Sequence, residues 1–546
     1  MLRKTIAAMA AFAATLLFSL GCPQQDVKQE TKTQPAPVGA QPDKTAAAPA
    51  PAVTAQPKPD AVLPGPTVAA APNAVDAPGA PVGPSSGALA NDPPFKDWPK
   101  PKAVIFCSGM QMGYIEPCGC SGKENQKGGL SRRANLLNKL AADGWPIEAV
   151  DVGGQIERFG KQAELKFLST ADALKAMHYH AIGFSADDLK LPAESLALAV
   201  TDLNQPQSPF VSANAAVLGF DQGLTPRFRI DTVGGIKIGV TSILGDAEQK
   251  TINNPDVAFK PAAAALAEIM PDLKKAGCDR LVLLAQASKA ETLALVQKFP
   301  EFDFVVVSYG APVPPPQPET APGTKTPLIE VSQKAEYVNV IGLFDDPKQP
   351  VRFERVALDA HWGESPDMKR VMAEYQDQLK TLGFAGLGIK PTPHPSGNTF
   401  VGSKTCGECH TKAFAVWEKT PHAKALDTLV KLDPPRNFDP QCLSCHVTGW
   451  DPQRFHPYEG GYDSLQKTPQ LADNGCENCH GPGSAHVAAE SGSKTLTDKD
   501  RDALRASMRV AFADAEKGCL HCHDGDNSIN FKFDTYWPKV AHKGKD

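Results

Sequence analysis

The stretch Cys476-Glu-Asn-Cys479-His480 is one of four copies of the same pattern near the C-terminal end of this chain. The other copies are Cys406-Gly-Glu-Cys409-His410, Cys442-Leu-Ser-Cys445-His446 and Cys519-Leu-His-Cys522-His523. This spacing attaches a haem of c type: two sulfurs add to the vinyl groups of one porphyrin, and the histidine lies under the iron as its proximal ligand. The composition predicts about 0.007 such motifs by chance. The four copies therefore predict four covalently bound haem c groups.

Zinc is the competing interpretation, because pairs of cysteines also form zinc knuckles. A zinc site needs a second ligand pair at a matching distance, and zinc gives no reason for a histidine directly after every pair. We therefore expect haem attachment by eight cysteines and proximal ligation by four histidines. The cysteines are Cys406, Cys409, Cys442, Cys445, Cys476, Cys479, Cys519 and Cys522, and the histidines are His410, His446, His480 and His523.

Length and charge limit the class of protein. A chain of 546 residues is too long for one hydrophobic core, so two or three domains are expected. The net charge of -5 argues against a nucleic-acid partner. Covalent haem attachment and paired cysteines both indicate a compartment outside the cytoplasm.

Residues 1–22 have the layout of a secretory signal peptide, with Arg3 and Lys4 before an apolar run that ends near Gly21-Cys22. A cysteine after a small residue resembles a bacterial lipoprotein site, at which lipidated Cys22 would hold the mature protein at the membrane. Ser19 stands where leucine is usual, so a cleaved, unlipidated signal and an uncleaved anchor are alternatives. No later stretch has the roughly 18 consecutive apolar residues of a membrane span. We expect a membrane-anchored protein on the periplasmic or cell-surface side.

Residues 23–101 are rich in proline and alanine and poor in aromatic residues. Such a segment buries too little apolar surface to fold, and its prolines keep it extended. The composition predicts a disordered tether, or a spacer whose length is not selected.

Residues 102–385 alternate between apolar strand-like runs and helical runs. Alternation of buried strands with helices predicts a layered α/β sandwich. Gly234-Gly235 joins two strand-like runs and predicts a hairpin. The expected strands include 103–106, 147–152, 180–183, 228–233, 236–243, 281–284 and 304–307, and the expected helices include 130–140, 163–177, 290–298 and 364–382.

The runs 113–120 and 128–133 of this region resemble the start of the 5'-nucleotidase-like branch of the calcineurin-type metallophosphatases. That family binds two metal ions through aspartate, asparagine and histidine at four strand ends. The matching positions here are Met110-Gln111-Met112, Gly153-Gly154, Gly183-Phe184-Ser185-Ala186 and Ser308-Tyr309-Gly310-Ala311. Hard divalent ions need carboxylate and imidazole ligands. The resemblance therefore implies a metallophosphatase-like fold, and the substitutions argue against phosphoesterase activity.

Soft side chains stand near those positions instead: Cys107, Met110, Met112, Cys118 and Cys120. Thiolate and thioether ligands suit Cu(I), and a Cys-x-Cys pair also forms a strained, easily reduced disulfide. Structural disulfides are the simpler alternative, either between Cys118 and Cys120 or with Cys107 and Cys278.

A short proline-rich joint leads to the haem region, residues 396–546. About 37 residues per haem are too few to wrap each porphyrin separately, so a mainly helical and irregular domain with closely spaced haems is expected. Met508 is the one methionine after residue 396, so most haems must be bis-histidine or five-coordinate. The candidates for distal ligands are His422, His456, His486 and His542, because His521 lies between two haem-bound cysteines.

The opening Val401-Gly402-Ser403, the run 479–486 and the ending 537–542 resemble the cytochrome c-554 family of tetrahaem cytochromes. In that family three haems are bis-histidine and one is five-coordinate. The resemblance implies that His422, His486 and His542 are distal ligands. His456 is then doubtful, either a fourth distal ligand or a surface residue.

Three functions are compatible with the sequence. The first is an electron carrier that exchanges electrons with redox partner proteins. The second is a haem enzyme that binds or reduces nitric oxide, hydroxylamine or nitrite at one five-coordinate iron. The third makes Cys118 and Cys120 the reaction centre, with the haems as their electron supply.

Overall fold

The computed structural model describes residues 93–118, 122–201 and 207–544. The chain divides into two units, Met1–Ser86 and Gly87–Asp546, and all described residues lie in the second. The predicted signal peptide, Cys22, most of the predicted tether and Cys120 lie outside the described residues. Within the described ranges, no helix combines the length and apolar character needed to cross a membrane.

Two mixed sheets form the centre of the α/β region. The first has the order β13-β12-β1-β2-β3 and the second the order β10-β11-β9-β8-β6-β5. The first sheet consists of β1 Ala103–Ser108, β2 Ile147–Asp151, β3 Ala181–Ile182, β12 Tyr337–Leu343 and β13 Val351–Ala357. The second consists of β5 Arg229–Val233, β6 Ile236–Leu244, β8 Arg280–Gln286, β9 Phe304–Val307, β10 Glu319–Thr320 and β11 Pro327–Glu330.

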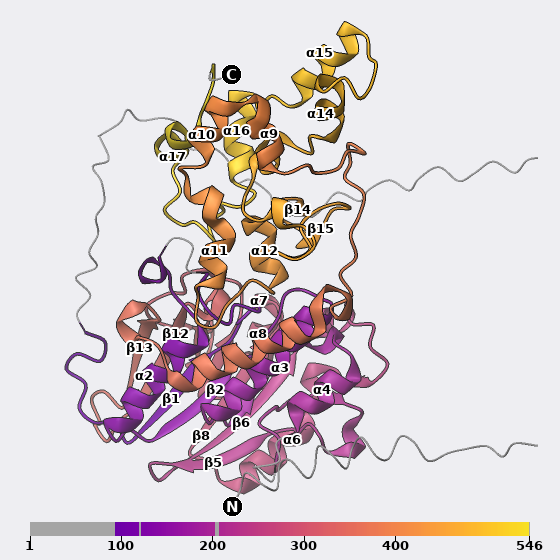
Figure 1. Cartoon of the computed structure of the whole chain (residues 1–546). Coiled ribbons are helices and arrows are strands. Elements are labelled where there is room, and N and C mark those ends of the chain that lie inside the picture. The colour runs from indigo at the N-terminus through magenta and orange to yellow at the C-terminus, as the bar shows by residue number, and fades with distance from the viewer. Residues whose placement is uncertain (1–92, 119–121, 202–206, 545–546) are drawn as a thin grey trace, which may run out of the picture. The chain divides into compact units, whose positions relative to one another are not determined.

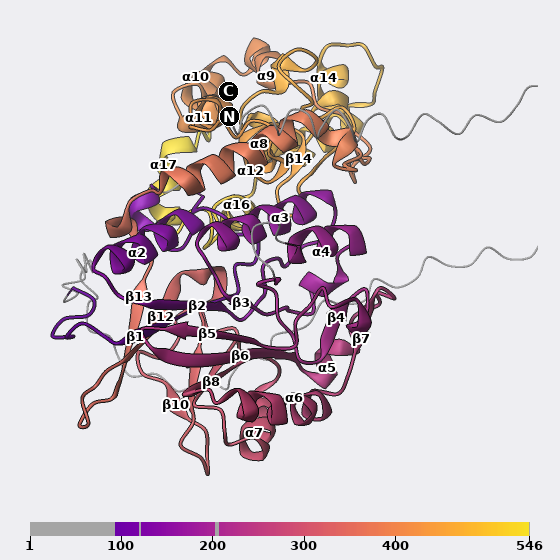
Figure 2. The ribbon, with the colours of Figure 1, turned by 90° about the horizontal axis from the view of Figure 1, so that it is seen from below.

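The sheets pack face to face, and helices cover both outer sides (Figure 2). Strand β1 contributes to both of the resulting cores, because alternate residues of a strand point to opposite faces. Val104 and Phe106 belong to the core between the first sheet and its helices, whereas Ile105 and Cys107 belong to the core between the two sheets. The helices on the first sheet are α2 Leu130–Ala142, α3 Lys161–Ala176 and α4 Ala193–Val200, with α8 Pro366–Gly386 packed on α2 and α3, and those on the second are α6 Ala262–Ala276 and α7 Lys289–Lys298.

The predicted α/β sandwich is therefore confirmed. The hairpin is also present, because β5 and β6 pair antiparallel with Val233 opposite Ile236. Gly234 and Gly235 have φ of 58° and 78° in its turn. Such left-handed conformations favour glycine.

The packed part of the chain begins inside the range predicted as a tether. Phe95 and Trp98 pack against the α/β core, and the rings of Trp98 and Trp145 stack with centroids 6.1 Å apart. Two large aromatic rings bury enough apolar surface to order this short segment despite its prolines. The exact domain boundaries stay a prediction.

The haem region consists of short helices with irregular connections. A small apolar cluster around Leu426, Leu443 and Trp450 is buried within it. The helices are α9 Ser403–Cys409, α10 Thr411–Trp417, α11 Ala425–Val430, α12 Pro440–His446, α13 Cys476–His480, α14 Ser484–Glu490, α15 Asp498–Ser507, α16 Phe512–Cys519 and α17 Phe533–Val540, and the ribbon β14 Trp450–Asp451 with β15 His456–Pro457 accompanies them.

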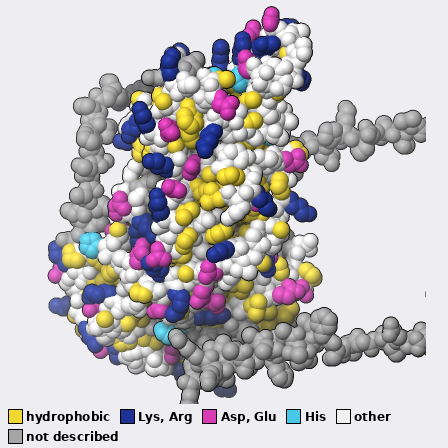
Figure 3. Space-filling model, viewed as in Figure 1, with side chains coloured by type: hydrophobic (Ala, Val, Ile, Leu, Met, Phe, Trp, Pro, Cys, Tyr) yellow, Lys and Arg dark blue, Asp and Glu magenta, His cyan; other side chains and the backbone are white. Residues whose placement is uncertain are grey.

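The α/β and haem regions contact each other at the start of α12, close to α3 and α8 (Figure 1). Asp439 accepts hydrogen bonds from Gln162 Nε2 at 2.8 Å and from Gln376 Nε2 at 3.1 Å. Basic and acidic side chains are interspersed over the face of the molecule drawn in Figure 3. This face offers no single-signed field of the kind that steers nucleic acid.

A polar cluster joins the two sheets away from the haem region's contact. His180 Nδ1 donates to Glu148 Oε2 at 2.8 Å and lies 3.2 Å from Asp231 Oδ2. The three residues could also hold a cation, since their ligand atoms lie within 4.8 Å of one another. A protonated His180 between two carboxylates accounts for the geometry. Its pKa is raised, most strongly by the hydrogen bond to Glu148.

We predict that this cluster makes stability depend on pH. Because the pKa of His180 is raised on folding, its contribution is complete below the ordinary value of about 6.5 and is lost as pH rises through the raised pKa. Urea unfolding followed by circular dichroism should show a loss of about 1 kcal/mol over that range. His180→Gln should remove this pH dependence, and an unchanged dependence would contradict the assignment.

Candidate functional site

Each of the four motifs lies on, or at the end of, a short helix. Helices α12 and α13 contain a whole motif, whereas α9 and α16 end at Cys409 and Cys519. Beyond the end of α9, the backbone N–H of His410 still donates to the carbonyl of Cys406 at 2.8 Å, as in a helix. Residues i, i+3 and i+4 of a helix point to the same side. Both sulfurs and the imidazole of a motif can thus reach one porphyrin.

Three of the motif histidines have Nδ1 in a hydrogen bond. His446 Nδ1 donates to Ala425 O and His480 Nδ1 to Met508 O, both at 2.6 Å. His523 Nδ1 lies 3.0 Å from a serine hydroxyl. A bond at Nδ1 fixes the orientation of an imidazole and leaves Nε2 for a metal. These residues fit the donor set that a haem iron requires.

Three predicted distal histidines each face a motif histidine. The distances between ring centroids are 6.3 Å for His410 and His486, 6.0 Å for His422 and His523, and 5.7 Å for His480 and His542. With metal–nitrogen bonds of about 2 Å, two nitrogens on opposite sides of one metal lie about 4 Å apart, and their ring centres about 6 Å apart. The spacing of each pair matches that of two axial imidazoles.

His456 lies in a different environment. It belongs to β15, its Nε2 is 2.9 Å from Thr392 Oγ1, and its ring centroid is 6.0 Å from that of Tyr458. The imidazole of His456 thus contacts Thr392 in the joint before the haem region, and it does not face a motif histidine. Met508 contributes its carbonyl oxygen, rather than its sulfur, to His480.

Neighbouring motifs meet at their cysteines. Sulfurs of the first and third motifs lie within hydrogen-bonding reach, as do sulfurs of the second and fourth, and the third and fourth motifs interact electrostatically. The pairs are Cys406 with Cys476, Cys445 with Cys522, and Cys479 with Cys519. The order of the attachment sites in space is therefore first, third, fourth, second.

The positions that match the metallophosphatase ligands do come together, at the carboxyl ends of the strands. Met110 Sδ is 3.6 Å from Gln286 Nε2, and Ser308 Oγ donates to Gln286 Oε1 at 2.7 Å. A Cβ on Gly154 would lie 2.5 Å from Met110 Sδ. A thioether does not fit hard divalent ions, and these four positions hold no carboxylate or imidazole. This ligand set does not suit the family's metal pair.

The buried cation Arg133 lies beside the positions that match the metallophosphatase ligands. Arg133 is fully buried, and its guanidinium is 3.5 Å from Asp151 Oδ2 and donates to Gln111 Oε1. Asp151 also accepts from Ser108 Oγ at 2.7 Å. A buried ion pair of this kind is tolerated only when hydrogen bonds satisfy both partners.

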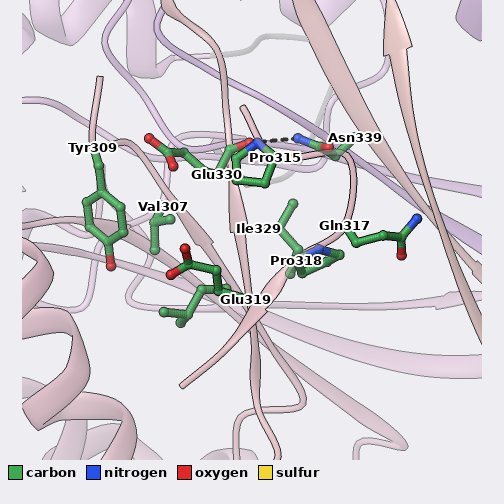
Figure 4. Close-up of a pocket in the computed structure, with 10 residues that line it drawn as sticks. Val307, Tyr309, Pro315, Gln317, Pro318, Glu319, Ile329, Glu330 and Asn339 are labelled. Atoms are coloured by element: carbon green, nitrogen blue, oxygen red, sulfur yellow. Dashed lines mark hydrogen bonds between the residues drawn. The ribbon is translucent and has the colours of Figure 1, made fainter. Parts of the chain in front are cut away.

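The last of the four positions borders a small hollow (Figure 4). Tyr309 and Glu330 line it, and Asn339 Nδ2 donates to the carbonyl of Glu330 at 2.8 Å. Its volume of about 20 Å³ holds about one water molecule. This hollow is too small for a nucleotide.

The soft side chains are not gathered in one cluster. Cys107 is enclosed between the two sheets, where burial raises its pKa, and Cys278 packs on the other side of the second sheet. Both are free thiols, so the predicted alternative in which Cys118 and Cys120 pair with Cys107 and Cys278 is not formed. Cys118 instead lies close enough to Cys442 and Cys445 to interact electrostatically with both. Pairing of Cys118 with Cys120 stays a prediction, because Cys120 lies outside the described residues.

Comparisons with known proteins agree with the motifs. Residues 405–481 match the family model of cytochrome c554 and c-prime. Over 146 residues the chain is 32% identical to cytochrome c-554 of Nitrosomonas europaea, covering 23% of this chain and 57% of that protein. The resemblance of the C-terminal region to cytochrome c-554 is thus confirmed, and it implies covalently bound haem c. The chain spans little more than half of that relative.

Solved structures resemble the chain over its α/β region. A 5'-nucleotidase precursor from Thermus thermophilus has a TM-score of 0.44 and 18% identity, covering 51% of this chain and 59% of that one. An NAD nucleotidase from Haemophilus influenzae has a TM-score of 0.42 and 16% identity, covering 59% of this chain and 69% of that one.

Sequence reasoning missed the residues that hold the second motif against the α/β region, above all Lys166 and Asp439. A signal for Asp439 was present. Aspartate directly before Pro440 is a typical N-cap followed by proline at the first helical position. Nothing in the sequence around Lys166 distinguishes it from a surface lysine.

We predict that Arg133→Met destabilises the α/β region by about 3 to 5 kcal/mol, because it leaves Asp151 buried without its cation. Urea unfolding of the full chain followed by circular dichroism measures this. Arg370→Met, which removes an arginine that is 65% exposed on α8, is the matched control and should change stability by about 0.5 kcal/mol or less. Equal effects of both substitutions would refute the role of Arg133.

Proposed function

We propose that the protein is an exported tetrahaem cytochrome c that transfers electrons between redox partner proteins. The three facing histidine pairs carry this proposal. Two imidazoles on one iron leave no position for a substrate and suit electron transfer. Haem c supplies reversible one-electron chemistry when bound. The similarity to cytochrome c-554 supports the same conclusion.

The proposal assigns a ligand set to each motif. The eight motif cysteines attach four haems, and His410, His446, His480 and His523 are the proximal ligands. The distal ligands are His486 at the first motif, His542 at the third and His422 at the fourth. The hydrogen bonds at Nδ1 orient the proximal rings.

The second motif supports the second candidate function, a haem enzyme for a small nitrogen compound such as nitric oxide, hydroxylamine or nitrite. His422, His486 and His542 each face another motif, and one histidine ligates one iron. The remaining candidate, His456, has its Nε2 at Thr392. We therefore propose a five-coordinate iron at His446.

The first experiment is low-temperature EPR of the oxidised protein, with the haem content measured as pyridine haemochrome. We predict four haems per chain and a high-spin ferric signal from about one in four, lost when nitric oxide is added. Four low-spin haems that ignore nitric oxide would overturn the five-coordinate site and leave a carrier.

Two substitutions sharpen this test. His542→Gly should add a second high-spin signal, because it removes one of the proposed distal ligands. His456→Gln is the matched control and should leave the spectrum unchanged. A new high-spin signal in His456→Gln would make His456 a ligand and contradict the assignment.

We also propose that lipidated Cys22 anchors the protein to the membrane on the periplasmic or cell-surface side. The signal-like residues 1–22 support this. Mass spectrometry of the mature N-terminus should find a lipid on Cys22, and Cys22→Ser should release the protein from the membrane fraction. An unmodified mature N-terminus would refute the anchor.

A further inference from the structure

The α/β region holds the second motif through residues that directly precede Cys442. Lys166 Nζ on α3 donates to Gln441 Oε1 at 2.6 Å and to Gly113 O at 2.9 Å. Arg436 forms an ion pair with Glu116, which also pairs with Lys123. These contacts fix the α/β segment Gly113–Cys118 beside the helix that carries this motif.

Lys166 stands out among the charges near this motif. Burial raises the pKa of Cys442 most strongly. Asp439 and Cys118 raise it further, and the cations Arg436 and Lys166 lower it. The charge of Arg436 is balanced by Glu116. Burial lowers the pKa of Lys166, and the carboxylate of Asp439 opposes this by raising it. This carboxylate, however, is also engaged by two glutamine amides and by the backbone of Gln441.

We propose that Lys166 is a positioning residue of the α/β region that raises the reduction potential of the haem attached at Cys442 and Cys445. This inference rests on the proposed function, since it presumes a haem at that motif. The oxidised iron carries one more positive charge than the reduced iron, so a cation fixed nearby in partly dehydrated surroundings disfavours oxidation. Surrounding charges and burial are among the means by which a protein tunes a haem.

The second motif lies at one end of the row of attachment sites, so a change in its reduction potential affects the end of that row. The attachment sites follow one another as first, third, fourth and second, so the second motif is one end of the row. The α/β region contacts that end. A cation there raises the potential of the haem at this end of the row relative to the value it would have without Lys166, and so favours an electron on that haem.

The test is a redox titration of the full holoprotein in which the high-spin ferric EPR signal is followed against applied potential. This signal reports the haem at His446 alone. Lys166→Met should lower its midpoint potential and leave those of the low-spin haems unchanged. Lys166→Arg, which keeps the charge, should restore most of the wild-type value.

Lys369→Met is the matched control, because Lys369 pairs with Asp433 at 2.7 Å at the exposed rim of the same contact. Solvent and salt screen that charge, so the potential should stay unchanged. An unaltered midpoint in Lys166→Met, with four haems and the high-spin signal retained, would overturn the inference. A wild-type protein without the high-spin signal would instead refute the proposed five-coordinate site. Haem content and circular dichroism show whether each variant folds.

Discussion

The carboxylate of Asp439 is the contact on which the arrangement of the two regions depends. It is only 5% exposed, and its Oδ1 accepts from the backbone N–H of Gln441 at 3.0 Å as the N-cap of α12. It also accepts hydrogen bonds from the side-chain amides of Gln162 on α3 and Gln376 on α8. A buried carboxylate is stable only when such donors surround it. One group therefore starts the helix of the second motif and orients that helix on the α/β region.

Local patterns explain what the sequence predicts well. The central strands β1, β8 and β9 are nearly continuous apolar runs because both of their faces are covered. The motif spacing places both cysteines and the histidine on one side of a helix. The facing of His410 and His486 joins residues far apart in the chain, and no local pattern encodes it. Only the family resemblance suggested that distal ligand. The same limit hid Lys166, whose partners lie in two different regions.

A buried carboxylate orders two of the loops at the positions that match the metallophosphatase ligands. Asp188 is buried and accepts from the backbone N–H groups of Gly154 at 2.8 Å, Gln155 at 2.9 Å and Ser185 at 2.9 Å. Burial raises its pKa to about 6, and these hydrogen bonds oppose that rise. Asp188 thus ties together two of the loops that correspond to ligand positions. Arg133 and Asp151 supply fixed charge beside them, so hydrogen bonds and an ion pair order these loops although the matching positions hold no carboxylate or imidazole.

The contact between the two regions combines an aromatic pair, Phe384 of α8 with Trp450 at 5.1 Å between ring centroids, with several charged groups. Separate proteins would gain little affinity from the charged groups, because the cost of removing charges from water offsets most of their attraction. Here the regions belong to one chain, and a covalent connection replaces affinity by a high effective concentration. The polar groups then contribute to orientation: Glu116 pairs with Arg436 and Lys123, and Asp439 accepts from amide donors of the α/β region. A fused domain can therefore fix a charged side chain beside one chosen motif, a precision that a transient partner would have to re-establish at every encounter.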